Sequence, residues 1–350
     1  MRICVFSDIH GNKVAFDKAS SRIVNEKADA NNQHLAYIST DLPEENWPWP
    51  TSSWKWRDHY SKRLRDYTLG LLWFAQHDPD LPEAFRLSCL EWGLAKDEYV
   101  DNNNFPRQVY VREGRRVDGE YLFAARDALP QGDGARPPIH WKSISSSHYS
   151  LDSHAVRKRE PDRVHLDGFF SYPTRPYTIP FGVIVPKEID ALLTPVPVSG
   201  THIGFSTLRM EPCWMALGQA AGLAASIALR DQVNVRDVEI SSLQQALIGE
   251  GAVLIYFEDA GPGTKDYEPL QFFALRGFFA ASEWQANLKN QVDEMTARKW
   301  IAWSGVGTVE IYQPGKTTKG ELLAELHRRV LNQPQQSRRA VLGKACRIVQ

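Results

Sequence analysis

The stretch that follows Pro212 is rich in small residues, and its composition suits a site for a cofactor. Proline at the start of a helix has its φ fixed and needs no N–H partner, so Pro212 predicts a helix over about residues 212–230. Gly218 and Gly222 are four residues apart and share one helical face, which Ala221 and Ala225 extend. Such a smooth face suits close approach by another backbone or by a flat ring system. The N–H groups and the positive dipole end at the helix N-terminus favour negative charge. A glycine- and alanine-rich helix packed on a sheet is the alternative interpretation.

Histidines gather upstream of this helix, at positions 140, 148, 154 and 165, with Asp152 nearby. Imidazole titrates near neutral pH, so His148 and His154 are candidate acids, bases or hydrogen-bond donors of a substrate pocket. Their spacing matches no known set of metal ligands, and we predict no bound metal. Polar loop histidines without a catalytic role are the alternative.

The N-terminus carries another chemical pattern. Residues 1–12 read as a strand followed by a loop with Asp8 and His10, and this segment resembles the opening motif of calcineurin-like metallophosphoesterases. In that family the carboxylate and the imidazole hold one metal of a two-metal site. The Gly-Asp, Asn-His and Gly-His-x-His motifs that complete such a site are absent from this sequence. We expect an inert strand and loop. A metal-dependent phosphoesterase that uses Asp8 and His10 is an alternative function.

A longer stretch, from Tyr177 to Ala225, resembles the C-terminal FAD-binding segment of the FAD-dependent oxidoreductase family that shares the glutathione-reductase-type fold. The shared features are, in order, Ile179-Pro180, Val185-Pro186-Lys187, Leu192-Leu193, Ser199 with His202, Ser206, Arg209, Met215 and the run from Gly218 to Gly222. The likeness extends from about Asn32 to Glu258.

This resemblance implies an α/β fold: a partial FAD-binding domain with an inserted mixed β-sheet substrate domain. It implies FAD as the cofactor and a small organic molecule as the substrate, with hydride passing from substrate to flavin. Helix 212–230 would face the pyrimidine edge of the flavin, and His202 and His148 are the candidate bases. The cofactor-binding residues implied are Ser199, Gly200, His202, Ser206, Arg209, Gly218, Gln219, Ala220 and Gly222.

One feature of the family is missing. Its members open with a strand, a Gly-x-Gly-x-x-Gly turn and a helix, which together hold the FAD pyrophosphate. This sequence contains no such turn. We therefore expect a truncated or rearranged relative that binds FAD weakly. A non-catalytic remnant without FAD is a further alternative.

The elements that must position these residues fall into four predicted segments. Residues 1–31 form an atypical strand and helix, 32–258 the oxidoreductase-like region, 267–331 a helical appendage around three tryptophans, and 332–350 a loose tail. Apolar residues at helical spacing predict helices over about 57–77 and 83–94. Alternating and apolar runs predict strands at 2–6, 165–172 and 252–257, a hairpin at 108–123 and two strands within 177–198.

Charge and cysteine content restrict the class of protein. Lys and Arg number 41 and Asp and Glu 42, so no overall basic field exists to bind nucleic acid or an anionic membrane. The apolar run 215–229 is shorter than the ~20 residues of a membrane span, and residues 1–12 lack a signal-peptide layout. We therefore expect a cytoplasmic protein. Cys4, Cys89, Cys213 and Cys346 are far apart, which favours free thiols.

Overall fold

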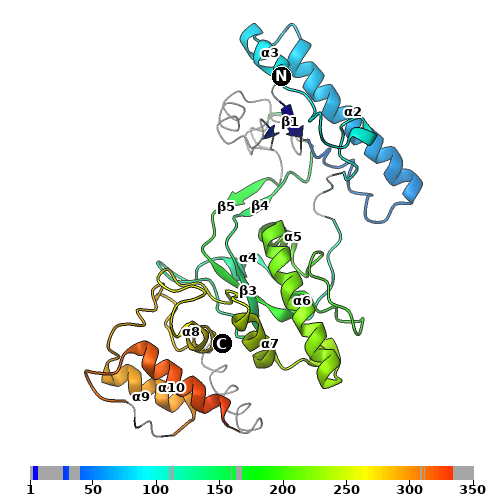
Figure 1. The fold of residues 1–350 in the computed structure, drawn as a ribbon. Coiled ribbons are helices and arrows are strands. Elements are labelled where there is room, and N and C mark those ends of the chain that lie inside the picture. The colour runs from blue at the N-terminus through cyan, green and yellow to red at the C-terminus, as the bar shows by residue number, and fades with distance from the viewer. Residues whose placement is uncertain are drawn as a thin grey trace. The chain divides into compact units, whose positions relative to one another are not determined.

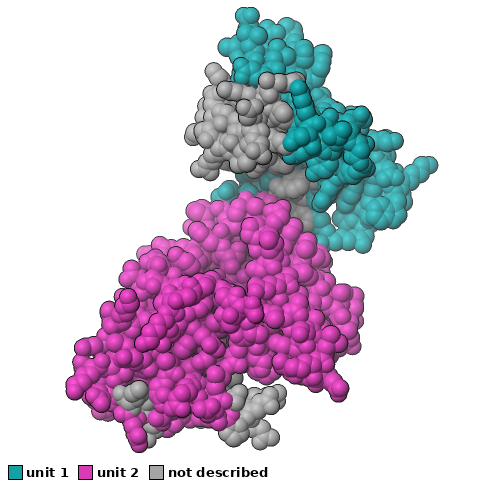
Figure 2. All heavy atoms as spheres, viewed as in Figure 1, with its two compact units in different colours: residues 1–115, 152–171 teal, residues 116–151, 172–350 magenta. Residues whose placement is uncertain are grey.

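The computed structural model describes residues 3–6, 27–30, 40–109, 111, 114–158, 160–162, 168–307, 310 and 312–333. The chain divides into two compact units (Figure 2). Unit 1 consists of residues 1–115 and 152–171, and unit 2 consists of residues 116–151 and 172–350. The four-segment division expected from the sequence stays a prediction.

Unit 1 begins with two short parallel strands, β1 (Ile3–Phe6) and β2 (Lys27–Ala30), whose register pairs Ile3 with Lys27 and Phe6 with Ala30. The strand predicted at the N-terminus is confirmed. A helix was expected after the first strand of segment 1–31. Residues 27–30 form the strand β2 instead, so this prediction is wrong there. Lys-Ala-Asp-Ala contains no β-branched or aromatic residue, so local preference gave no sign of a strand. Asp8 and His10 lie outside the described residues.

The long helix α2 (Trp54–His77) and the shorter α3 (Glu83–Leu90) follow, and then a 3-10 turn, η1 (Val100–Asn102). Both predicted helices are confirmed. α2 starts three residues earlier than expected because the Ser53 side chain accepts a hydrogen bond from Trp56 N, which caps the helix. Tyr60 and Leu64 of α2 form a small core with Leu42.

Unit 2 combines small sheets with helices, which is compatible with the expected α/β class (Figure 1). α4 (Ala125–Ala128) precedes β3 (Ser143–Ser147), which pairs antiparallel with β6 (Tyr177–Pro180). Between these, β4 (Leu151–Ser153) and β5 (Phe170–Tyr172) pair with each other where the chain leaves and re-enters the unit. The later elements are η2 (Phe181–Val183), α5 (His202–Leu208), α6 (Glu211–Asp231), η3 (Val235–Asp237), α7 (Ile240–Gly249), α8 (Tyr267–Ala274), α9 (Glu294–Ser304) and α10 (Lys319–Leu331).

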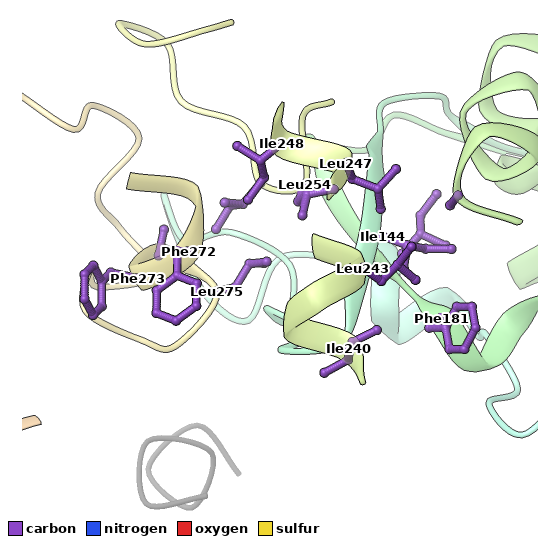
Figure 3. Close-up of a cluster of buried hydrophobic side chains, with 14 of the residues drawn as sticks. Ile144, Phe181, Ile240, Leu243, Leu247, Ile248, Leu254, Phe272, Phe273 and Leu275 are labelled. Atoms are coloured by element: carbon purple, nitrogen blue, oxygen red, sulfur yellow. The ribbon is translucent and has the colours of Figure 1, made fainter. Parts of the chain in front are cut away.

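One hydrophobic cluster runs through unit 2, from β3 and β6 across α6 and α7 to α8 and α10. Figure 3 shows part of it, where Ile144 of β3 and Leu243 of α7 lie close to each other. The predicted helices at 212–230 and beyond residue 267 are confirmed. Trp300 of α9 is 2% exposed and belongs to the same cluster, with Trp303 packed against it.

Two strand predictions are wrong in the described residues. For the hairpin expected at 108–123, the described residues form isolated bridges instead, from Gly119 to Pro186 and from Phe123 to Gly200. Residues 252–257 form no strand, because side chains satisfy their backbone: Gln271 Oε1 accepts from Leu254 N and Ile255 N, at 2.8 and 2.9 Å. Within 177–198 only β6 is a strand, and residues 181–183 form a 3-10 turn.

α6 is the one described helix that is long and apolar enough to cross a membrane by length and composition. A core helix of a soluble protein meets the same test, so this is weak evidence for a membrane span. The apolar run 215–229, which by itself is shorter than a membrane span, lies within this helix.

Candidate functional site

The residues that the sequence predicts for cofactor binding lie on α5, on α6 and on the loop before α5, all in unit 2. Thr201 caps α5 by accepting a hydrogen bond from Gly204 N at 3.0 Å, and the helix ends at Arg209. α6 begins two residues later with Pro212 in its first turn. Its N-cap residue, Met210, provides no side-chain hydrogen bond. The first-turn N–H groups of α6 therefore carry the positive dipole end without a side-chain cap.

Tyr149 brings His148 and Arg209 to this junction. The Arg209 guanidinium lies 5.7 Å from the Tyr149 ring centroid. The Tyr149 carbonyl accepts hydrogen bonds from Thr174 Oγ1 at 2.7 Å and from Thr207 Oγ1 at 2.5 Å. His148 Nε2 lies 3.0 Å from Thr174 O. The loop after β3, the loop before β6 and the end of α5 are thus linked through Tyr149, and the Arg209 guanidinium lies near its ring.

The other predicted base, His202, lies at the opposite end of α5. It is half-buried, and burial together with the charge of Arg116 lowers its pKa. Arg116 Nε also donates to Gly200 O at 3.1 Å. At 1.5 Å per helical residue, the rise from His202 to Thr207 is about 8 Å. His202 and His148 are therefore associated with different ends of this helix.

Backbone contacts fix the start of α5 against residues 123–124. Phe123 N donates to Ser199 O at 3.3 Å, and Thr201 N donates to Phe123 O at 2.8 Å. A Cβ on Gly204 would lie 2.2 Å from Phe123 O, so glycine is required for this approach. Ser199 and Ser206 are fully buried. Ser206 Oγ donates to Ile203 O at 2.7 Å, whereas Ser199 Oγ is buried without a hydrogen-bond partner.

The predicted glycine face of α6 is open. A Cβ at Gly218 or at Gly222 would meet no atom within 4 Å. Gln219 is exposed, whereas Ala220 is fully buried and points into the core. Ala220 therefore supports the helix from within, and the surface available to a ligand is formed by Gly218, Gln219 and Gly222.

A family model described as FAD dependent oxidoreductase matches residues 2–247. The chain belongs to the FAD-dependent oxidoreductase family. No curated protein and no solved structure matches it. The match covers β1, β2 and all of unit 1, so it begins earlier than the likeness seen from about residue 32.

Two features of this family member bear on whether its residues fit the cofactor. The open Gly218–Gly222 face of α6 leaves room for a flat ring system. The unpartnered Ser199 Oγ is a polar atom whose hydrogen bonding is incomplete. These features fit a bound flavin in part, and the roles of the individual residues stay predictions. Among the described residues, no group of three or more His, Cys, Asp or Glu side chains is arranged to hold a metal ion.

The sequence did not predict Arg116 and Tyr149, which contact residues of the candidate site, or the buried Asp127 of the neighbouring α4. Asp127 is 3% exposed and accepts a hydrogen bond from Tyr121 Oη at 2.7 Å. No periodic pattern links Tyr121 to Asp127, because an extended segment precedes the four-residue helix α4. The expectation of free thiols is confirmed for Cys89 and Cys213, which are buried.

Proposed function

We propose that this chain is a FAD-dependent oxidoreductase that transfers hydride from a small organic substrate to flavin. The family match over residues 2–247 supports the oxidoreductase class and the cofactor as a family trait. The observation that carries the proposal for this chain is the open Gly218–Gly222 face of α6. The N-terminus of this helix has no side-chain cap, and Arg209 precedes it in the chain.

The chemistry of this face suits a flavin. Flavin supplies a two-electron acceptor, and its pyrimidine edge gains negative charge on reduction. The α6 N-terminus and the Arg209 guanidinium would stabilise that charge, since both present positive charge. Gly218 and Gly222 would allow the ring system to lie close to the helix, and the exposed Gln219 would supply an amide for hydrogen bonding.

We expect the affinity for FAD to be low. The pyrophosphate normally rests on a glycine-rich turn at a helix N-terminus, and this sequence contains no Gly-x-Gly-x-x-Gly turn. Charge-assisted hydrogen bonds contribute about 1.5–3 kcal/mol each. Two missing bonds of this kind weaken binding by roughly a hundredfold or more.

The test is a titration of the purified chain with FAD, followed by flavin fluorescence. We expect saturable binding that is weaker than micromolar and that Gly218→Leu abolishes. The Cβ of this leucine would meet no atom within 4 Å, and circular dichroism of the variant checks that the fold is retained. Gly70→Leu in α2 is the matched control, because a Cβ there also meets no atom within 4 Å. Absence of FAD binding by the wild-type chain would overturn the proposed function and favour a non-catalytic remnant.

A further inference from the structure

A tyrosine, an aspartate and a histidine form a compact cluster in unit 2. Tyr121 Oη donates to Asp127 Oδ1 at 2.7 Å. His140 Nε2 faces the same oxygen at 3.5 Å, and its side chain is 14% exposed whereas that of Asp127 is 4% exposed. The Tyr121 and His140 rings are 5.0 Å apart, edge to face. A buried carboxylate is thus shared between a phenol and an imidazole.

The fold holds each member in place through its backbone. Asp127 Oδ2 accepts from Ala124 N at 2.7 Å, which closes the start of α4. Tyr121 N donates to Gly182 O at 3.1 Å. His140 N donates to Thr178 Oγ1 at 2.9 Å, which ties the histidine to β6. Asp127 lies on α4, and backbone hydrogen bonds to η2 and β6 hold Tyr121 and His140, which lie outside helices and strands.

The cluster borders the segment expected to bind the cofactor. The Phe123 backbone, between Tyr121 and Asp127 in the chain, pairs with Ser199 and Thr201. The start of α5 approaches the Phe123 and Ala124 backbone so closely that Gly204 admits no side chain. The Phe123 and Ala124 backbone thus connects the Tyr121–Asp127 segment to residues 199–204.

His140 Nε2 is buried and makes no hydrogen bond. Burial lowers the pKa of His140, and the Asp127 carboxylate offsets this in part. Burial and Asp127 both raise the pKa of Tyr121, so the phenol stays protonated, while Arg126 acts weakly in the opposite direction. A carboxylate that faces an imidazole favours the imidazolium, and this is the arrangement of a general base with an orienting acid.

The other candidate bases have different surroundings. His202 faces the cation Arg116, which disfavours a second positive charge. His148 is exposed, and its Nε2 lies beside the Thr174 carbonyl. His140 instead faces a carboxylate.

We propose that His140 is the proton acceptor of the oxidation, positioned by Asp127 and Tyr121. This inference rests on the proposed function. A proton on Nε2 faces Asp127, so Nδ1 accepts the proton that the substrate loses: from oxygen or nitrogen in an alcohol or amine, and from carbon in a nitroalkane. Flavin, when bound, would supply the two-electron acceptor: the adjacent C–H bond of the alcohol or amine would break with its hydrogen and both electrons passing to that acceptor, and the substrate would become a carbonyl compound or an imine.

Histidine NMR tests the cluster without any cofactor. The imidazole signal of His140, assigned with His140→Gln, is titrated in the full chain. Asp127→Asn should lower the His140 pKa by about one unit or more, because a carboxylate within about 4–6 Å shifts a pKa by 1–3 units. Asparagine retains an oxygen for the Ala124 N–H group, so the start of α4 is preserved. Tyr267→Phe, which removes a hydroxyl bonded to Ala252 O, is the control and should leave this pKa unchanged.

Anaerobic reduction of the FAD-loaded chain tests catalysis with two probes that differ by one proton. Neutral nitroethane must lose a proton to a base before it can reduce flavin, whereas its preformed nitronate has already lost it. His140→Gln should slow reduction by nitroethane by about 100-fold or more, since a general base contributes 10²–10⁴-fold. Its rate with nitronate should stay within about twofold of wild type.

The outcomes separate this inference from the proposed function. Failure of the wild-type chain to bind FAD would overturn the proposed function and, with it, this inference. With FAD bound and nitronate reactive, an unchanged nitroethane rate in His140→Gln would overturn the inference alone. Equal slowing with both probes would do so too, since it would indicate a structural role. An unshifted His140 pKa in Asp127→Asn would refute the positioning role of Asp127.

Discussion

Asp41 and His154 form a buried hydrogen-bonded pair in unit 1, with His154 Nδ1 lying 2.7 Å from Asp41 Oδ2. Their side chains are 2% and 4% exposed, and 113 residues separate them in the sequence. The pair joins residues 152–158 to the segment that leads into α2. Trp47 Nε1 adds a hydrogen bond to Val156 O at 2.9 Å. The second part of unit 1 is thereby fixed to the first.

Removing one partner of this pair should destabilise unit 1. We expect Asp41→Ala or His154→Ala to cost about 3–5 kcal/mol, because each leaves a buried polar group without this partner. The double variant should cost less than the sum of the two single variants. Chemical denaturation of the full chain, with hydrogen exchange to localise the effect to unit 1, measures these values. The control is Glu45→Gln, which breaks the exposed pair with Lys158 and should cost less than about 1 kcal/mol. Additive single and double effects would contradict coupling between Asp41 and His154.

Gln271 replaces a missing strand partner for residues 254–255. Its Oε1 accepts two backbone N–H groups, and its Nε2 donates to Ile255 O at 2.7 Å. Gln271→Leu keeps the volume but leaves these buried groups unsatisfied, at about 1–3 kcal/mol each. We expect a loss of several kcal/mol in the free energy of unfolding, measured by urea denaturation. Gln285→Leu, at an exposed position, should change it by about 0.5 kcal/mol or less. A similar small effect for Gln271→Leu would show that the amide is dispensable.

His327 makes unit 2 sensitive to acid. Burial, and next the charge of Arg276, lower its pKa to about 4 from an ordinary 6.5. Between these two values the unfolded chain binds a proton and the folded chain does not, so stability is lost as the pH falls from 6.5 towards 4. The shift corresponds to about 3 kcal/mol at most. Unfolding midpoints at pH 7 and pH 4.5 should differ less in His327→Leu than in the wild type. An equal difference in both proteins would assign the acid sensitivity to other groups.

Local sequence signals predicted the elements that depend on local causes. Pro212 and the spacing of Gly218 and Gly222 were sufficient for α6, because a helix satisfies its own backbone. The strand predicted at 252–257 failed for the converse reason: its partners are the side chains of Gln271 and Ser143, which lie far away in sequence. A strand-like sequence indicates that the backbone needs hydrogen-bond partners, but it does not indicate which residues provide them.

The candidate site could be predicted only in part for the same reason. The run from Ser199 to Gly222 is continuous, so its resemblance to a cofactor segment was visible in the sequence. The contact of His140 with Asp127 depends on α4 and β6, which bring together residues that no spacing rule connects. Helix geometry did predict that Gly218 and Gly222 share a face, but not that this face is open.

Arg136 offers a test of the predicted boundary at residues 259–266. It is 3% exposed, donates to Glu283 O at 2.8 Å and to Tyr256 O, and stacks on Phe257 and Trp284 at 4.6 and 4.2 Å. These contacts tie the chain on both sides of residues 259–266 to the loop at 130–138. Arg136→Ala should remove these contacts. Arg136→Lys should not restore them, because an ammonium lacks the planar fork of donors.

Limited trypsin digestion measures the outcome, since Lys265 is exposed within this segment. We expect the first cut after Lys265, at a rate that rises about tenfold or more in Arg136→Ala and in Arg136→Lys. Arg298→Gln, which breaks an exposed pair with Glu294, is the control and should leave that rate unchanged. First cuts at Arg298 or Lys299, with Lys265 intact, would contradict a boundary at 259–266, because they would place the weakest segment inside α9. If Arg136→Lys is cleaved at the wild-type rate, a positive charge at position 136 is sufficient to hold the two sides of the segment in place.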